Sequence, residues 1–220
     1  MSVRGERKTP RQRITEGIVG SVLKEVDQKY GPDSEQSMAY HNRMHTENVL
    51  NAATMMGQLI GFSPEDMDSL RIAAAYHDIV HGKGGGINEV ESSVLAASTM
   101  RQAGIYTDEE IATVELIILT TTPVITDGRI RQSAEEDDLL AAVLCDADLA
   151  TFGAEPEIFW ARALDYERER LGKSELTEDE IKDFIKHQIK FMEAHNFYTA
   201  AARQLFPHKE DNIEWLKGQL

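Results

Sequence analysis

Apolar residues recur at steps of three and four along most of this chain, as in the series Val49, Ala52, Met56 and Leu59. That spacing aligns side chains on one face of a helix, whereas a half-buried strand would place them at every second position. Strand signals are scarce by comparison. We therefore predict an all-α protein that folds as a single compact helical bundle with short connections.

Helix starts are marked by Ser or Thr followed three residues later by Glu, because this pair of side chains satisfies exposed backbone N–H groups reciprocally. The pairing occurs at Thr107/Glu110, Ser133/Glu136 and Thr177/Glu180. Proline marks two further starts, at Pro64 after Ser63 and at Pro156. The predicted helices cover residues 11–30, 44–61, 64–81, 88–104, 108–121, 134–152, 156–171, 178–204 and 210–218.

The length of 220 residues and the 41% hydrophobic content suit one domain with a substantial core, and no linker-like segment divides the chain. We expect residues 13–220 to form this domain. Residues 1–12 are expected to form a flexible basic arm, because the first part of the chain carries a solvated cluster of cations. These are Arg4, Arg7, Lys8, Arg11 and Arg13.

The formal net charge of −15 argues against a surface that binds nucleic acid, which requires clustered Lys and Arg. No apolar stretch approaches the ~18 residues needed to cross a bilayer. We therefore expect a cytoplasmic protein whose partner is a small molecule, with no nucleic-acid or membrane partner. The oligomeric state is left open.

Two histidines and several aspartates form a candidate metal site. His45 shares the apolar face of its predicted helix with Val49 and Ala52, and the adjacent pair His77-Asp78 lies near the end of another apolar run. An Asp146-Ala-Asp148 triplet follows far downstream. Residues two apart on a helix point about 200° from each other, so only one of the two aspartates can reach a given ion. We favour Asp148, with Asp146 as the alternative.

This order of ligands resembles the HD-domain superfamily of metal-dependent phosphohydrolases, whose ligand set is a histidine, an adjacent His-Asp pair and a distant aspartate. His45, His77, Asp78 and Asp148 match it. The chain is similar to the predicted metal-dependent HD phosphohydrolase branch in further segments. These are Tyr40-His41-Asn42, Asn88-Glu89 with Ser92, Asp146-Ala-Asp-Leu with Gly153, Tyr166-Glu-Arg-Glu and Phe197-Tyr-Thr.

The resemblance implies an HD-type helical bundle and a metal-dependent phosphohydrolase. Dinuclear HD enzymes carry additional histidines between the His-Asp pair and the final aspartate, where this chain has His81 alone. We therefore expect one divalent ion, with His81 as a further ligand or a helix-end residue. Histidine and aspartate together suit Mn, Fe, Co, Ni or Zn, and Mg is also considered.

The expected reaction is hydrolysis of a phosphoester of a small molecule such as a nucleotide, with water activated at the ion. Whether the substrate is a phosphomonoester or a phosphodiester is left open. Asp78 and Glu89 are the candidates for proton transfer. The candidates for substrate contacts are His41, Arg43, Lys83 and Arg168. The alternative is a non-catalytic module that binds metal or nucleotide. A third possibility, an oxygenase, would require redox-active iron and a second ion.

Overall fold

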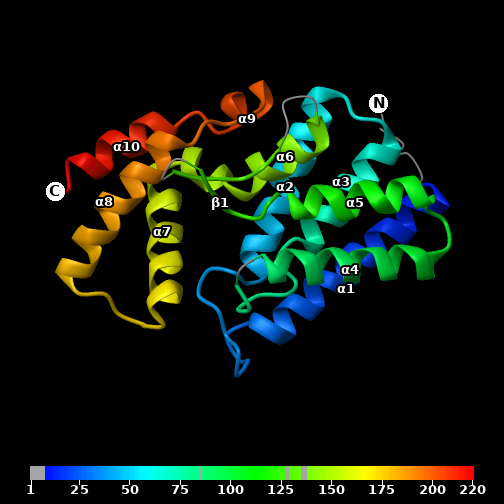
Figure 1. Ribbon diagram of the computed structural model, residues 1–220, viewed down its shortest axis with the longest axis horizontal. Coiled ribbons are helices and arrows are strands. Elements are labelled where there is room, and N and C mark those ends of the chain that lie inside the picture. Colours follow the sequence, from blue (N-terminus) through cyan, green and yellow to red (C-terminus); the bar gives the residue numbers. More distant parts are fainter. Residues whose placement is uncertain (1–7, 85, 127–128, 135–137) are drawn as a thin grey trace, which may run out of the picture.

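The computed structural model describes residues 8–84, 86–126, 129–134 and 138–220, and within them it confirms the all-α class (Figure 1). A short antiparallel hairpin, β1 (Val124–Thr126) with β2 (Arg129–Arg131), is the exception among these residues. The helices are α1 (Pro10–Tyr30), α2 (Arg43–Ile60), α3 (Pro64–Tyr76), α4 (Ile87–Ala103), α5 (Asp108–Leu119), α6 (Leu139–Asp148), the 3-10 helix η1 (Ala150–Gly153), α7 (Pro156–Leu171), α8 (Glu178–Ala194), α9 (Ala200–Leu205) and α10 (Lys209–Lys217).

Four of the predicted helix starts are confirmed. Thr107 and Thr177 form capping boxes at the starts of α5 and α8, and Ser63 accepts a backbone N–H at the start of α3. Pro156 is the first residue of α7. These starts are predictable because each cap is made by residues within one turn of the helix it begins.

The start of α6 differs from the prediction. Glu136, half of the predicted Ser133/Glu136 pair, lies outside the described residues. The helix begins at Leu139, and its cap is the Asp138 side chain, which accepts the N–H of Ala141 at 3.0 Å. Asp138 is an equally good helix cap, so the predicted start at 134 was several residues early.

Helix α3 ends at Tyr76, before the predicted end at residue 81. Within the predicted helix, two later N–H groups have partners on distant segments: that of Val80 donates to Ser92 Oγ at 3.2 Å, and that of His81 donates to Tyr30 Oη at 2.9 Å. These contacts join distant parts of the chain, and the buried Val80 still fits an apolar pattern. Periodicity alone therefore predicts too long a helix.

The predicted helix 178–204 is two helices, α8 and α9. Between them, the N–H groups of Tyr198 and Thr199 donate to the two carboxylate oxygens of Asp146, each at 2.8 Å. The Thr199 hydroxyl then accepts the N–H of Ala202 and caps α9. A buried carboxylate from α6 thus holds the extended segment that separates the two helices.

Helix α3 is the centre of the larger half of the molecule. It contacts α1, α2, α4, α5 and α6, and the side chains of Leu70, Ile72 and residues 73–75 are fully buried. A helix surrounded on all sides needs apolar or small residues all round, as this sequence provides. In Figure 1, α1, α3, α4 and α5 lie together on the right, with α2 and α6 beside them toward the middle.

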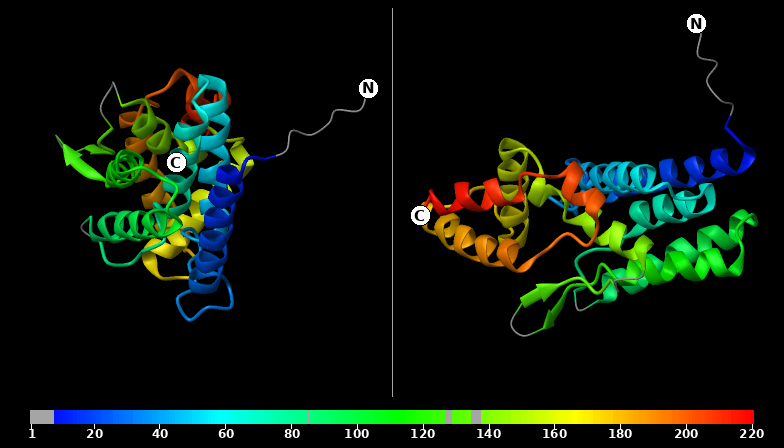
Figure 2. Two further views of the ribbon diagram at one scale, coloured as in Figure 1. Left: turned by 90° about the vertical axis from the view of Figure 1, so that its right-hand side faces the viewer. Right: turned by 90° about the horizontal axis from the view of Figure 1, so that it is seen from above.

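Helices α7, α8 and α10 form the opposite end of the molecule, seen on the left in Figure 1 and in the right-hand view of Figure 2. Helix α10 packs against α7, α8 and η1. Gly153 makes one close approach possible, because a Cβ atom there would lie 2.1 Å from the carbonyl oxygen of Phe206. Any other residue at this position would push the chain before α10 away from η1.

Part of the expected basic arm is helical. Residues 1–7 lie outside the described residues, whereas α1 begins at Pro10, within the predicted arm. Arg11 forms ion pairs with Asp68 at 2.8 Å and with Glu110 at 2.5 Å, so this cation joins α1 to α3 and α5. None of the helices in the described part of the chain has the length and apolar content that a membrane crossing requires.

Candidate metal centre

His45 lies in the first turn of α2 and is buried. The Asn42 side chain accepts the N–H groups of Met44 and His45 and so fixes where this helix begins. The ring of Tyr40 lies 4.7 Å from the His45 ring, and the Arg162 guanidinium lies 4.6 Å from the ring of Tyr40. The side chain of His45 is therefore held between its own helix and residues that precede it.

His77 and Asp78 follow α3 directly. The Nδ1 atom of His77 lies 2.9 Å from the carbonyl oxygen of Ala74. A carbonyl can only accept, so Nδ1 carries a hydrogen and Nε2 is the nitrogen that can bind either a proton or a metal ion. A backbone partner of this kind orients a metal-binding imidazole. The Nε2 atom of His77 is accordingly free to serve as a ligand.

Asp148 and Asp146 have different surroundings. Asp148 Oδ1 lies 3.3 Å from His45 Nε2 and 3.6 Å from His77 Nε2. Asp146 is fully buried and accepts from the backbone of Tyr198 and from the backbone and hydroxyl of Thr199. The structure therefore places Asp148 beside the histidines and Asp146 at the start of α9.

Four side chains from three regions of the sequence converge at one point. The Nε2 atoms of His45 and His77 are 3.2 Å apart, and Asp78 Oδ2 lies 3.2 Å from the first and 3.1 Å from the second. With Asp148, the four ligand atoms all lie within 4.8 Å of one another. Ligands bound at about 2.0–2.2 Å are about 3 Å apart, so the group can hold one divalent ion with little movement.

The charges in this group favour a cation. Burial lowers the pKa of His77, but Asp78 and Asp148 outweigh burial and raise that pKa well above its ordinary value. Burial has the opposite effect on the carboxyl groups, yet the histidines hold the pKa of Asp78 and that of Asp148 below their ordinary values. The carboxylates are thus ionised, and His77 holds a proton that an incoming cation would displace.

A second group of possible ligands, His41, His81 and Glu169, lies nearby. Glu169 accepts from His41 Nδ1 and from the N–H groups of Tyr40 and His41. The rings of His41 and His81 are stacked 3.9 Å apart with an angle of 23° between their planes. An ion bound to two imidazoles lies close to both ring planes, and stacked rings offer no such point. We therefore interpret this group as a hydrogen-bonded contact between α7, the segment before α2 and the segment after α3.

One cavity of about 850 Å³ opens onto both groups. Its lining includes four carboxylates, Asp78, Glu89, Asp148 and Glu169, and extends to aromatic side chains of η1, α7 and α8. Glu89, in the first turn of α4, is buried, and its Oε2 atom has no hydrogen-bond partner among the described residues. Burial, with further help from Asp78 and Asp148, raises the pKa of Glu89.

The residues considered for substrate contacts differ in position. His41 lines the cavity, whereas Arg43, Lys83 and Arg168 are absent from its described lining. Each of the three is paired with a nearby carboxylate, since Arg43 bonds Glu47, Lys83 bonds Glu91 and Arg168 bonds Asp165. A long cationic side chain readily forms an ion pair with a nearby carboxylate. The sequence alone does not show whether such a side chain pairs in this way or points into the cavity.

Two residues near the group have no signal in the sequence. Arg170 is the only Lys or Arg in the described lining, and it forms two hydrogen bonds to Glu167, at 2.6 Å and 2.7 Å. Gln132 donates to Asp148 Oδ2 at 2.6 Å, 16 residues away in sequence. Gln132 lies in the segment after β2 and orients the Asp148 carboxylate. No local sequence pattern indicates this contact.

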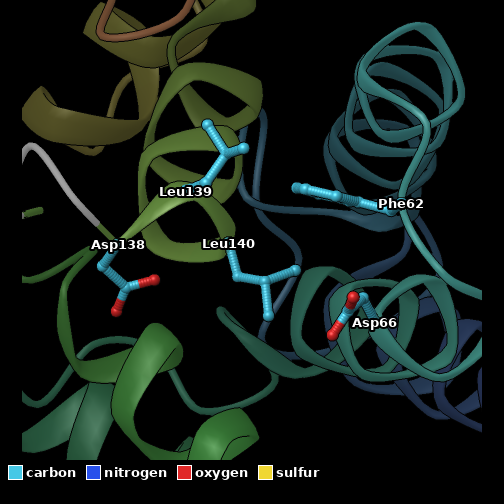
Figure 3. Close-up of a pocket in the computed structure, with 5 residues that line it drawn as sticks. All are labelled: Phe62, Asp66, Asp138, Leu139 and Leu140. Carbon is cyan, nitrogen blue, oxygen red and sulfur yellow. The ribbon is translucent and has the colours of Figure 1, made fainter.

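A smaller hollow of about 450 Å³ lies at the surface between α6 and the corner that joins α2 to α3. Figure 3 shows Phe62 pointing toward Leu139 and Leu140, with Asp66 and Asp138 at the sides. Both carboxylates already act at helix starts, Asp66 with Ser63 and Asp138 with Ala141. The hollow therefore offers no chemical group of its own.

Comparison with known proteins agrees with this geometry. Residues 43–151, which contain all four converging side chains, match the model of the HD-domain family. No curated protein matches the chain by sequence. Among solved structures, the chain is similar to the crystal structure of Bacillus subtilis YpgQ in complex with ADP, with a TM-score of 0.60 and 16% identity over 96% of this chain and 95% of that chain. At this identity the likeness establishes a shared fold. Residues 43–151 of this chain therefore form an HD domain.

Proposed function

We propose that this protein is a metal-dependent phosphohydrolase that acts on a small phosphorylated molecule. The observation that carries the proposal is the convergence of His45, His77, Asp78 and Asp148 at one wall of a large cavity. Two neutral imidazoles and two carboxylates form a ligand set for one divalent transition ion and leave positions open for water and substrate. When bound, such an ion acidifies water and neutralises charge on a phosphoryl group.

The protein's own residues prepare the site in two ways. Asp78 and Asp148 remain ionised near neutral pH because their pKa values are lowered, so they favour a cation and orient the histidines. Glu89 has a raised pKa, which brings its proton exchange closer to neutral pH. We assign Glu89 the role of general base that takes a proton from the attacking water.

The cavity supports a phosphorylated substrate of moderate size. Its volume of about 850 Å³ falls in the range of about 300–1,000 Å³ that small-molecule sites occupy. The solved structure of the similar YpgQ protein contains ADP, which is consistent with a nucleotide in a fold of this kind. We infer a nucleotide as the substrate class here.

We propose that each chain binds one metal ion. The group formed by His41, His81 and Glu169 is already occupied by internal hydrogen bonds and ring stacking. Metal analysis of protein saturated with Mn, Fe, Co, Ni, Mg or Zn should therefore give one ion per chain. Replacement of Glu169 by Gln should leave that ratio unchanged, and two ions per chain would contradict the assignment.

The activity is tested with purified protein, each metal in turn, and a panel of nucleotides and simple phosphomonoesters and phosphodiesters. We expect metal-dependent release of phosphate or a nucleotide product that His77→Ala abolishes. The matched control is His187→Ala, because His187 is an exposed histidine on α8 whose ring bonds the Asp183 carbonyl one turn away. Metal retention without hydrolysis of any substrate would instead support a non-catalytic binding module.

A further inference from the structure

One part of the cavity is lined by residues from η1, from α8 and from the end of α8. Four side chains define it, and we call them the α8 subsite: Phe152, Gln188, Phe191 and His195. The cavity that contains them also contains Asp78 and Asp148. A single molecule can therefore reach from the candidate metal centre to the α8 subsite.

His195 has a hydrogen-bonding group with no partner in the protein. The residue is 7% exposed, and no group among the described residues bonds its Nε2 atom. Its ring packs edge to face against Phe152 at 5.6 Å and Phe197 at 5.1 Å. Burial lowers the pKa of His195 to about 4, so the ring is neutral at pH 7, with one nitrogen that donates and one that accepts.

Gln188 lies on α8, about two helical turns before its end, and His195 is the residue that caps this end. It is 8% exposed, and among the described residues no hydrogen bond to its side-chain amide is found. The Gln188 side chain lines the cavity, so its amide is available to a ligand there, as is the buried Nε2 atom of His195.

The remaining side chains of the α8 subsite are aromatic. The rings of Phe152 and Phe191 lie 5.2 Å apart at an angle of 88°. Phe191 is partly exposed within the cavity, so a flat group can stack on its ring. Aromatic faces beside neutral donors and acceptors are suited to a planar heterocycle with a polar edge, and they are unsuited to a sugar or phosphate alone.

We propose that the α8 subsite binds a nucleobase, with Gln188 and His195 bonding its polar edge and Phe191 stacking on its face. The inference rests on the proposed function for the phosphate end of the substrate. Beyond that function, the inference identifies the residues that select the base. A nucleobase supplies donors and acceptors in one plane, which satisfies the amide and the imidazole together.

The first test measures binding of nucleosides, which lack phosphate, to the metal-free protein by calorimetry. Adenosine, guanosine, cytidine and uridine are compared with ribose. At least one nucleoside should bind and ribose should not. Gln188→Leu and His195→Phe keep the side-chain size and should weaken binding about tenfold or more, because a ligand group is left unpaired. His187→Leu, an exposed neighbour on the same helix, is the matched control.

The second test compares hydrolysis of the corresponding nucleoside monophosphate with hydrolysis of ribose 5-phosphate, both with metal. Gln188→Leu should raise KM for the nucleotide and leave kinetics on ribose 5-phosphate unchanged. Thermal unfolding verifies that each variant is folded. Equal use of both phosphates by the wild-type protein, with no nucleoside binding, would overturn the α8 subsite and leave the phosphohydrolase proposal intact. Nucleoside binding that depends on Gln188, with no hydrolysis of any substrate, would support the subsite and overturn the phosphohydrolase.

Discussion

The Nε2 atoms of His45 and His77 lie 3.2 Å apart, although 32 residues separate the two histidines in the sequence. At that distance two imidazole nitrogens cannot both present lone pairs without a proton or a cation between them. The carboxylates of Asp78 and Asp148 beside them add negative charge. The arrangement therefore requires a positive charge at its centre, either a proton or a metal ion.

Metal binding should release protons and should tighten as pH rises. Because the pKa of His77 is raised, the metal-free histidine holds its proton at neutral pH and competes with the ion. The same shift stabilises the metal-free fold below the ordinary pKa of histidine, and this stabilisation is lost as pH rises through the raised pKa. Calorimetry in two buffers with different ionisation enthalpies measures proton release. Equal heats in both buffers would argue against the assignment.

The two aspartates of α6 should give opposite results when each is replaced by Asn. Asp148→Asn should abolish tight metal binding and leave the protein folded, because Asp148 lies in the candidate centre. Asp146→Asn should cost about 2 kcal/mol in the free energy of unfolding, since one buried oxygen that accepts from Thr199 becomes a donor. Urea unfolding and metal titration of both variants check this. Metal loss confined to Asp146→Asn would reverse the assignment.

Glu89→Gln should lower kcat by about 10²- to 10⁴-fold while metal affinity stays within a small factor of the wild type. Glu89 must be ionised to accept a proton, so wild-type activity should fall as pH decreases through its raised pKa. The variant should lack this acidic limb. Glu91→Gln is the control, because Glu91 lies on the same helix, is exposed and bonds Lys83. An unchanged pH profile in Glu89→Gln would exclude Glu89 as the base.

Phosphate affinity should depend on the ion. The only Lys or Arg in the described lining, Arg170, is already bonded to Glu167, and four carboxylates share the cavity. Removal of metal with EDTA should therefore weaken binding of a nucleoside monophosphate by about a hundredfold, toward that of the nucleoside alone. Calorimetry with and without metal measures the change. Undiminished phosphate binding in EDTA would indicate a cationic site elsewhere.

Stability should fall in weak acid because of His195. Its pKa of about 4 in the folded protein lies below the ordinary value of 6.5, so the unfolded chain binds more protons between these values. The loss from this group between pH 7 and pH 5 is about 2 kcal/mol. His195→Phe should show a correspondingly smaller loss of unfolding free energy over this range. Parallel pH dependence of the variant and wild type would contradict the assigned protonation.

Much of the fold could be predicted because its determinants are local. Thr107, Thr177 and Ser63 each begin a helix through a contact within one turn, and the sequence pattern is sufficient to find them. The order of His45, His77-Asp78 and a distant aspartate predicted the HD domain for a similar reason. The types of ligand residue and their order can be read from the sequence without knowledge of the packing.

The remaining features depend on contacts between distant segments. The end of α3 is set by Ser92 and Tyr30, and neither changes the apolar pattern of the helix. The choice between Asp146 and Asp148 depends on which side of α6 faces α9, a property that spacing does not contain. Gln188 and His195 likewise fit a buried helical face whether they adjoin a cavity or solid core.

Asp146 fastens the segment between α8 and α9 to the same helix that carries Asp148, with one residue between the two carboxylates in the sequence. His195 lies only three residues before the fastened Tyr198. In the proposed function, this anchored segment helps to set the distance between the ion and the base, so we expect the cavity to select substrates by their length. Compounds whose phosphorus and ring are separated by a much shorter or longer spacer would engage one end at the expense of the other.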